Sequence, residues 1–456
     1  MRSLLVLDVV GLTPSLVGEN TPNIQGLADA GFQAQLRGSF PALTTTAQST
    51  MLTGRLPRDH GVVGNGWYFR DLSEVWLWRQ SDRLVEGSKI WEKARQRQAG
   101  LRCAKVFWWY NMYSTADISV TPRPAYLADG RKLPDIYTQP APLREELHRE
   151  LGSFPLFHFW GPGAGIRSSR WIGRAAEYII EKERPEITLV YLPHLDYDLQ
   201  RHGPGFSGLP TALRQVDDVA GRLIELARRQ DMEVVVLSEY GITAARASVS
   251  INRILRGEGW LAVHNAANGE LLDAGASRAF AVADHQVAHV YVQRPEDTAA
   301  VARLLESVDG VDQVLDRDGQ RSFGIDHARS GELLAVATED RWFDYRYWLD
   351  DRRAPDFART VDIHRKPGYD PVELFLDPAQ PLIQLKVLGK LLQKRLGFRY
   401  LMDVVSLDTS LVKGTHGRLP SSPEDGPLLI SSSAKQKTSH LEITEVAELL
   451  MDTMFG

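Results

Sequence analysis

Three apolar runs, each close to an acidic residue, most constrain what this chain can fold into. Residues 3–10 form a continuous apolar run broken only by Asp8, and similar runs cover 187–193 and 233–239. Such runs are typical of strands that are buried on both faces of a parallel sheet. Between the last two runs, residues 209–229 place leucine and valine at helical spacing. Strands that alternate with helices predict an α/β fold, with a central, mostly parallel sheet flanked by helices.

The acidic residues fall where such a sheet binds ligands. Asp8, Asp196 and Glu239 lie at or just past the ends of the three runs. In open α/β sheets, ligands bind outside the carboxyl ends of the strands. The sequence therefore predicts a functional site built around three carboxylates.

Size and composition favour one large domain. The 456 residues can hold a single α/β domain with insertions, and we expect one domain over 1–456 with a cap or insertions at about 60–175 and 245–400. The net charge of −5, without a long run of Lys or Arg, gives no electrostatic footprint for nucleic acid. The single cysteine, Cys103, excludes an intrachain disulfide framework.

No stretch predicts a membrane span or a secretion signal. The apolar run at the N-terminus is too short for a signal peptide and has no small-residue cleavage site. None of the apolar runs reaches the roughly 18 residues that span a bilayer. We therefore expect a cytoplasmic protein that acts on a small molecule.

Residues 40–61 carry the most specific motif. A Phe-Pro-Ala-Leu-Thr segment ends at Thr44, and Thr-Gly-Arg-Leu-Pro-Arg-Asp-His-Gly follows from Thr53 to Gly61. This order, after an early strand that carries an Asp, resembles the alkaline phosphatase superfamily. The resemblance is to its nucleotide pyrophosphatase/phosphodiesterase branch in particular, and to its phosphonoacetate hydrolases. It implies an alkaline phosphatase-like α/β core.

The resemblance implies that Thr44 is the nucleophile of a two-metal hydrolase. Coordination to a dication lowers the pKa of a hydroxyl and supplies an alkoxide, and the start of a helix helps to bind an anion. Alternatively, Thr44 caps the helix that follows it. Thr45 or Thr46 takes the nucleophile role if the register differs.

The implied ligands of the first metal are Asp8, Thr44, Glu239 and Tyr240. The last two stand in Ser-Glu-Tyr-Gly, where the family has an Asp followed by a His. Glu replaces Asp if the backbone lies about one methylene further back. Tyr binds a metal only as phenolate, and otherwise hydrogen-bonds the substrate or packs.

The implied ligands of the second metal are Asp196, Gln200 and His416. His416 lies in Gly-Thr-His-Gly, which resembles the family's Gly-x-His-Gly, and Asp196 precedes a Gly-Pro pair as in the family. Gln200 stands where the family has His. His202 is an alternative to Gln200, either alone or paired with Asp198 at the correct spacing.

Together these features predict a metal-dependent hydrolase of phosphodiesters or pyrophosphates. The expected cofactors are two divalent ions, zinc first, with manganese or magnesium as alternatives. The alternatives in function are a phosphonate (C–P) hydrolase and a degenerate member that binds a metabolite without turnover. His364 has no family counterpart and is either a further ligand, a substrate contact or structural. Asp284, His285 and His289 are expected to be structural.

Overall fold

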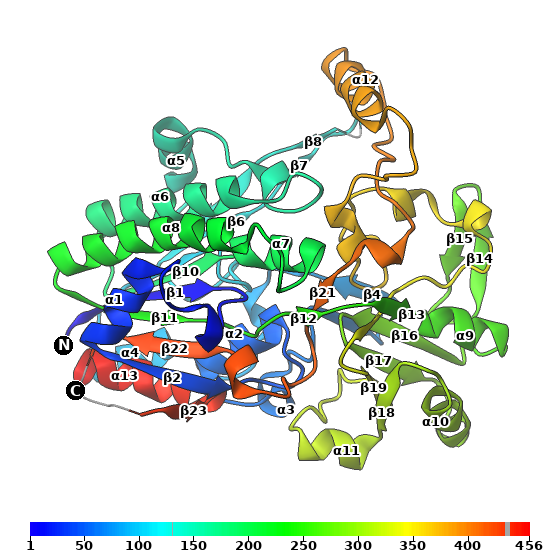
Figure 1. Ribbon diagram of the computed structural model, residues 1–456, viewed down its shortest axis with the longest axis horizontal. Helices are drawn as coiled ribbons and strands as arrows, with labels where there is room; N and C mark the ends of the chain where they lie inside the picture. The colour runs from blue at the N-terminus through cyan, green and yellow to red at the C-terminus, as the bar shows by residue number, and fades with distance from the viewer. Residues whose placement is uncertain (130, 434–437) are drawn as a thin grey trace.

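A computed structural model describes residues 1–129, 131–433 and 438–456 (Figure 1). Within these ranges the largest feature is a nine-stranded sheet, and its central strands β11, β1, β10, β5 and β6 are parallel. The confirmed architecture is therefore α/β with a mostly parallel sheet. The strands, in spatial order, are β23 (His440–Glu442), β2 (Phe32–Arg37), β22 (Leu428–Ser431), β11 (Met232–Leu237), β1 (Ser3–Val9), β10 (Ile187–Leu192), β5 (Cys103–Val106), β6 (Ile118–Pro122) and β9 (Ile136–Gln139).

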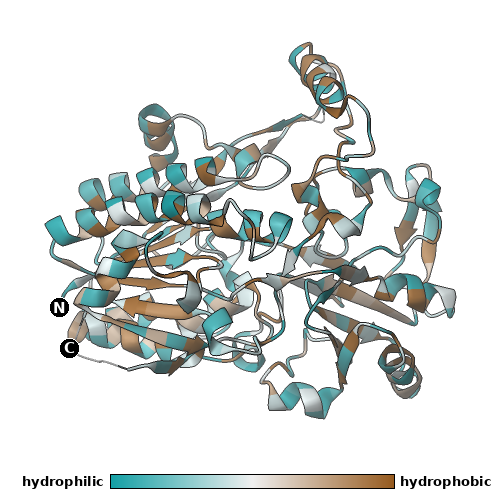
Figure 2. Cartoon of the chain, viewed as in Figure 1, coloured by the Kyte–Doolittle hydropathy of each residue, from teal (hydrophilic) through white to brown (hydrophobic). Residues whose placement is uncertain are grey.

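Helices cover both faces of this sheet (Figure 1). One face packs against α1 (Pro22–Ala30), α6 (Ile166–Glu183) and α8 (Leu209–Arg229), and the last of these confirms the helix expected at 209–229. The opposite face packs against α2 (Thr44–Thr53), α4 (Ile90–Arg97) and α13 (Val446–Phe455). Figure 2 shows apolar strands between helices whose outer sides are polar, as burial of both faces requires.

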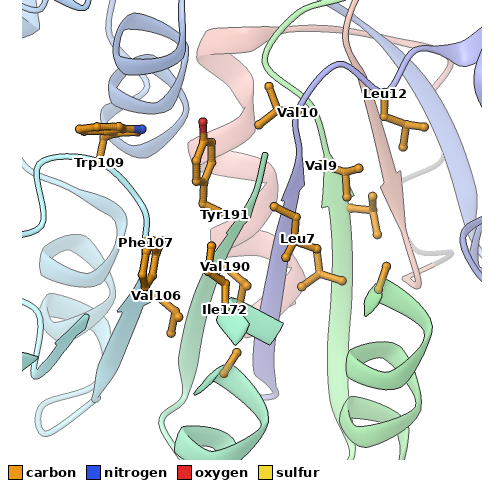
Figure 3. Packing of buried hydrophobic residues seen from close by; sticks show 14 of the residues in the cluster. Leu7, Val9, Val10, Leu12, Val106, Phe107, Trp109, Ile172, Val190 and Tyr191 are labelled. Atoms are coloured by element: carbon orange, nitrogen blue, oxygen red, sulfur yellow. The ribbon is translucent and has the colours of Figure 1, made fainter. Parts of the chain in front are cut away.

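The alternation of β1 decides which way Asp8 points. Leu7 and Val9 belong to the apolar cluster under α6 and α8, and Figure 3 shows them next to the neighbouring strands. Val6 belongs to the cluster on the other face, with Met51 of α2. Since successive side chains of a strand point to opposite faces, Asp8 lies on the α2 side of the sheet.

A smaller antiparallel sheet lies beside the central one. Its order is β16 (Ala279–Asp284), β17 (Val287–Val292), β19 (Leu333–Ala337) and β18 (Val311–Leu315), and α9 (Ile251–Gly257) and α10 (Thr298–Glu306) accompany it. These elements fall in the insertion expected at 245–400. The segment 60–175 is different, because it contributes β5, β6 and β9 to the central sheet. The four-residue β5 cannot be predicted from an apolar run, because a buried lysine, Lys105, interrupts its apolar pattern.

Short elements connect these layers. No helix in the described part of the chain is long and apolar enough to cross a membrane. The remaining helices and strands are α3 (Pro57–His60), β3 (Gly66–Phe69), β4 (Glu74–Leu77), β7 (Ala125–Tyr126), β8 (Lys132–Leu133), α5 (Leu143–Leu151), α7 (His194–His202), β12 (Thr243–Ala244), β13 (Ala247–Val249), β14 (Val263–Ala266), β15 (Gly269–Leu272), α11 (Arg317–Ser322), β20 (Arg341–Phe343), α12 (Ile383–Arg395) and β21 (Gly414–Thr415).

Candidate active site

The three predicted carboxylates lie together at the carboxyl edge of the central sheet. Asp8 is on β1, which pairs with β10 on one side and with β11 on the other. Asp196 lies in the first turn of α7, which follows β10, and Glu239 lies two residues after β11. All three side chains are buried. Adjacent parallel strands thus bring together residues that are far apart in the sequence.

Helix α2 brings Thr44 and Gln48 to the same place. The helix begins at Thr44, and Gln48 is one turn further on the same face. The Gln48 amide donates hydrogen bonds to Asp8 Oδ2 (3.0 Å) and Glu239 Oε1 (2.7 Å). Its oxygen accepts from the backbone N–H of Trp109 (2.8 Å). Since a backbone N–H can only donate, the NH₂ group of Gln48 must face the carboxyl groups.

Burial makes the Asp8–Glu239 pair hard to ionise. Desolvation raises the pKa of Asp8 to about 7, and desolvation together with the neighbouring Asp8 raises the pKa of Glu239 well above its usual value. Hydrogen bonds from Gln48 and, at Glu239, from Thr44 act in the opposite direction. Asp8 Oδ1 and Glu239 Oε2 are buried without a hydrogen-bond partner. The pair therefore holds two acceptor atoms that are open to a proton or a cation.

A chain of hydrogen bonds leads from Thr44 to the second group of predicted residues. Thr44 Oγ1 lies 2.9 Å from the Tyr240 hydroxyl, which donates to Asp196 Oδ1 (3.4 Å). Gln200 donates to Asp196 Oδ2 (2.7 Å), and Tyr369 donates to the Gln200 oxygen (2.9 Å). Burial and the nearby carboxylates raise the pKa of Tyr240 well above its usual value. Tyr240 is therefore a neutral hydrogen-bond donor here.

His416 and His285 share one tautomer. His416 Nδ1 lies 2.8 Å from the Ala42 carbonyl oxygen, and His285 Nδ1 lies 2.7 Å from Asp284 Oδ1. Both contacts require a proton on Nδ1, which leaves Nε2 as a lone-pair donor. Burial holds the pKa of both imidazoles well below the usual value, so both are neutral. Histidines that bind metals commonly adopt this arrangement.

Four aromatic rings stack in a column across the site. The ring centroids of Tyr240 and His416 are 3.6 Å apart, those of His416 and His285 are 3.7 Å apart, and those of His285 and Tyr369 are 3.7 Å apart. A small hollow, lined in part by Tyr240, His416 and Arg418, lies beside one end of the column. The column fixes the position of the Tyr240 hydroxyl next to Thr44.

Several predicted alternatives lie elsewhere. His202 is exposed at the end of α7 and packs on Phe206, while Asp198 pairs with Arg201. His364 is at the surface, 3.4 Å from the Leu77 carbonyl oxygen. None of these residues joins the carboxylate cluster.

The neighbours of Thr44 on α2 point elsewhere as well. The Thr45 hydroxyl donates to the Gly64 carbonyl oxygen (2.8 Å), and the Thr46 hydroxyl is buried without a partner. Thr44 is the member of this threonine run that contacts Tyr240 and Glu239.

The structure adds residues that the sequence did not place in the site. Gln48 could have been found from its spacing of four residues after Thr44 on a predicted helix. His285 was expected to be structural, and Tyr369 had no such signal, because they come from the second sheet and a long loop. Asp284, expected to be structural, accepts hydrogen bonds from the Asn65 backbone (2.9 Å) and side chain (3.2 Å) and so ties the loop after α3 to β16.

The first predicted metal-binding group fits one hard cation. Its donors are oxygens, and Asp8 and Glu239 each keep an unpartnered oxygen. Oxygen donors suit magnesium, manganese or calcium better than zinc.

The second group is less suited to a metal in this arrangement. Both oxygens of Asp196 and the oxygen of Gln200 each accept a hydrogen bond from this chain, so a cation held there together with Nε2 of His416 would compete with these bonds. Among the described residues, no three His, Cys, Asp or Glu side chains are grouped to hold a metal ion.

Known proteins share both the sequence pattern and the fold. The family model for type I phosphodiesterase / nucleotide pyrophosphatase matches residues 4–370. A pyrophosphatase/phosphodiesterase of Schizosaccharomyces pombe is 25% identical over 246 residues, which are 52% of this chain and 42% of that protein. Ectonucleotide pyrophosphatase/phosphodiesterase 1 of Saccharomyces cerevisiae is 23% identical over 269 residues, which are 52% of this chain and 34% of that protein. The matched region thus spans less than half the length of these relatives.

Solved structures of the same fold cover the whole chain. Phosphonoacetate hydrolase of Sinorhizobium meliloti with phosphonoformate has a TM-score of 0.61 at 13% identity, covering 100% of this chain and 96% of that one. Murine ectonucleotide pyrophosphatase/phosphodiesterase 5 with AMP has a TM-score of 0.60 at 13% identity, and the match covers 100% of this chain and 95% of that one. At this identity the likeness concerns the fold, whereas the family model covers most of the sequence. This chain belongs to the type I phosphodiesterase / nucleotide pyrophosphatase family.

Proposed function

We propose that this protein hydrolyses phosphate esters of the phosphodiester or pyrophosphate type, with Thr44 as the nucleophile. The observation that carries the proposal is the place of the Thr44 hydroxyl, which is buried at the start of α2 and contacts Tyr240 and Glu239. Family membership supports the reaction class, because the family model is that of phosphodiesterases and nucleotide pyrophosphatases.

The neighbouring carboxyl groups supply the base. Burial raises the pKa of Asp8 to about 7 and the pKa of Glu239 well above its usual value, and Glu239, which contacts the Thr44 hydroxyl, can take its proton when ionised. Tyr240 has a neutral hydroxyl 2.9 Å from Thr44 Oγ1 and orients the Thr44 hydroxyl. A divalent cation held by Asp8, Thr44 and Glu239 would lower the pKa of the Thr44 hydroxyl and offset the charge of both carboxylates.

The reaction would proceed in two displacements. Oγ1 of Thr44 forms a bond to phosphorus while the bond from phosphorus to the leaving oxygen breaks, and the leaving oxygen takes a proton. Water then cleaves the Thr44–phosphate bond and restores the hydroxyl. The complex of a neighbouring structure with AMP supports a nucleotide substrate, and that of another with phosphonoformate supports a phosphonate as the alternative.

One observation favours a second candidate function, which is binding without turnover. Gln48, Gln200 and Tyr240 satisfy most of the acceptors around Asp196 and between Asp8 and Glu239 from within the chain. A site stabilised in this way can hold a phosphorylated metabolite and not cleave it.

An assay panel separates these candidates. Turnover of p-nitrophenyl phosphate, bis-p-nitrophenyl phosphate and phosphonoacetate is measured after chelation and after addition of Mg²⁺, Mn²⁺ or Zn²⁺, together with the metal content of the protein. We expect cation-dependent turnover of the diester and one bound cation per chain. Turnover of phosphonoacetate alone supports the phosphonate alternative. If no substrate turns over with any cation while AMP binds, the binding function replaces the proposal.

A further inference from the structure

Helix α12 (Ile383–Arg395) presents an uncovered apolar face. None of its residues is buried, and Leu385, Leu388 and Leu392 are 61%, 63% and 56% exposed. Figure 1 shows the helix at the tip of a projection from the body, and Figure 2 shows the apolar segments on it. Eight of the fifteen exposed large hydrophobic side chains among the described residues lie on α12 or on the residues directly before and after it: Leu382, Leu385, Leu388, Leu391, Leu392, Leu396, Phe398 and Leu401.

The polar side of α12 faces the rest of the protein. Lys386, Lys390 and Lys394 recur every four residues and therefore share one side of the helix. Lys386 and Lys390 pair with Asp403 at 2.8 Å and 3.4 Å, and Lys394 donates to the Lys132 carbonyl oxygen (3.2 Å). These contacts hold the lysine side inward, so the leucine side is turned to the outside.

An exposed face of this kind marks a contact site. Burial of a leucine side chain is favourable, and soluble proteins rarely leave so many clustered leucines in water. Within the described residues Leu385, Leu388 and Leu392 stay more than half exposed, so the fold buries little of their apolar surface. A partner that removes them from water would therefore bind with a substantial hydrophobic contribution.

The charge of the segment identifies the partner. Residues 378–403 contain five basic residues and one acidic residue, Asp403, which pairs with Lys386 and Lys390, in a chain whose net charge is −5; the basic residues are Lys386, Lys390, Lys394, Arg395 and Arg399. A helix with leucine and phenylalanine on one side and lysine on the other is typical of helices that lie in the interface of an anionic bilayer. Basic residues near such a surface are attracted to its anionic headgroups.

A second copy of the chain fits this face less well. Packing of this segment against the same segment of a second copy would bring Arg395 and Arg399 of both copies close together, and its one acidic residue, Asp403, already pairs with Lys386 and Lys390. We propose that α12 docks the protein on an anionic lipid surface, with Leu385, Leu388 and Leu392 inserted among the acyl chains. At thirteen residues the helix lies in the interface and does not span the bilayer.

The test is co-sedimentation of the full chain with vesicles. We compare vesicles of phosphatidylcholine alone with vesicles that also contain phosphatidylglycerol, at low and at high salt. We expect binding to the anionic vesicles, weakened by salt. The double variant Leu388→Glu/Leu392→Glu should lower the affinity at least ~10-fold, because it removes two inserted side chains.

A matched control makes the result specific. Leu349 is 59% exposed in another loop, and Leu349→Glu introduces the same chemistry away from α12. It should bind vesicles like the parent protein. Light scattering of each variant in solution reports its oligomeric state, and circular dichroism reports folding. Absence of binding to anionic vesicles overturns the proposal, and so does equal binding to both kinds of vesicle. A dimer that only the α12 variant dissociates assigns the face to a second copy instead.

Discussion

At the scale of single residues, Gln48 and Tyr240 set the character of the site. Gln48 places a neutral amide between Asp8 and Glu239, and Tyr240 places a neutral hydroxyl between Thr44 and Asp196. Both act as hydrogen-bond donors where the family resemblance implies metal coordination. Gln48 and Tyr240 both lie in this site because each donates a hydrogen bond to a buried acceptor.

Replacing Gln48 changes the pH dependence. The pKa of Asp8 is about 7. Hydrogen bonds from Gln48 lower this pKa and also lower the pKa of Glu239. Gln48→Ala removes them, so both pKa values rise and the proton-accepting forms appear only at higher pH. We expect the acid limb of the pH profile of kcat/KM to move to higher pH. Gln80→Ala, outside the cluster, should leave the profile in place, and a Gln48→Ala profile that stays in place or moves to lower pH would contradict this role.

At the scale of elements, the turns after the strands hold the site together. Gly241 follows Glu239 and Tyr240, and a Cβ built on it would lie 1.8 Å from the Asp425 carbonyl oxygen. The turn therefore needs glycine because the backbone of the last residue of η9 (Pro423–Asp425) passes against it.

Gly241→Ala should separate these two segments. We expect a loss of at least ~1–3 kcal/mol in the free energy of unfolding, measured with urea, together with lower activity. Gly257 lies in α9 with open space around it, so Gly257→Ala should be neutral or slightly stabilising. Equal stability of Gly241→Ala and Gly257→Ala would show that the turn can move aside.

The same elements show what the sequence could predict. The strands around 3–10, 187–193 and 233–239 followed from their long apolar runs, and the helix at 209–229 followed from its helical spacing. The short β5 could not be predicted in this way, because its four residues include a buried lysine and form no clear apolar pattern. The gathering of Asp8, Asp196 and Glu239 followed from their places after parallel strands, whereas hydrogen-bond partners could not be read from spacing.

At the scale of the whole molecule, the site joins two sheets. Thr44, Glu239 and Asp196 come from the central sheet and its helices, while His285 follows β16 of the smaller one. The ring column from Tyr240 to Tyr369 therefore depends on how the two parts pack. A contact of this kind arises only from the tertiary structure, so the sequence left His285 as structural.

The whole account depends on Thr44 as the reacting group, and one comparison tests this most directly. We would measure kcat/KM for bis-p-nitrophenyl phosphate with the parent protein, Thr44→Ala and Thr45→Ala, in the presence of the most effective divalent cation. Thr45 lies next in the helix, and its hydroxyl bonds the Gly64 carbonyl oxygen. The account predicts a loss of at least ~10³-fold for Thr44→Ala, as expected when a nucleophile is removed, and a much smaller loss for Thr45→Ala. Activity of Thr44→Ala close to that of the parent protein would contradict it.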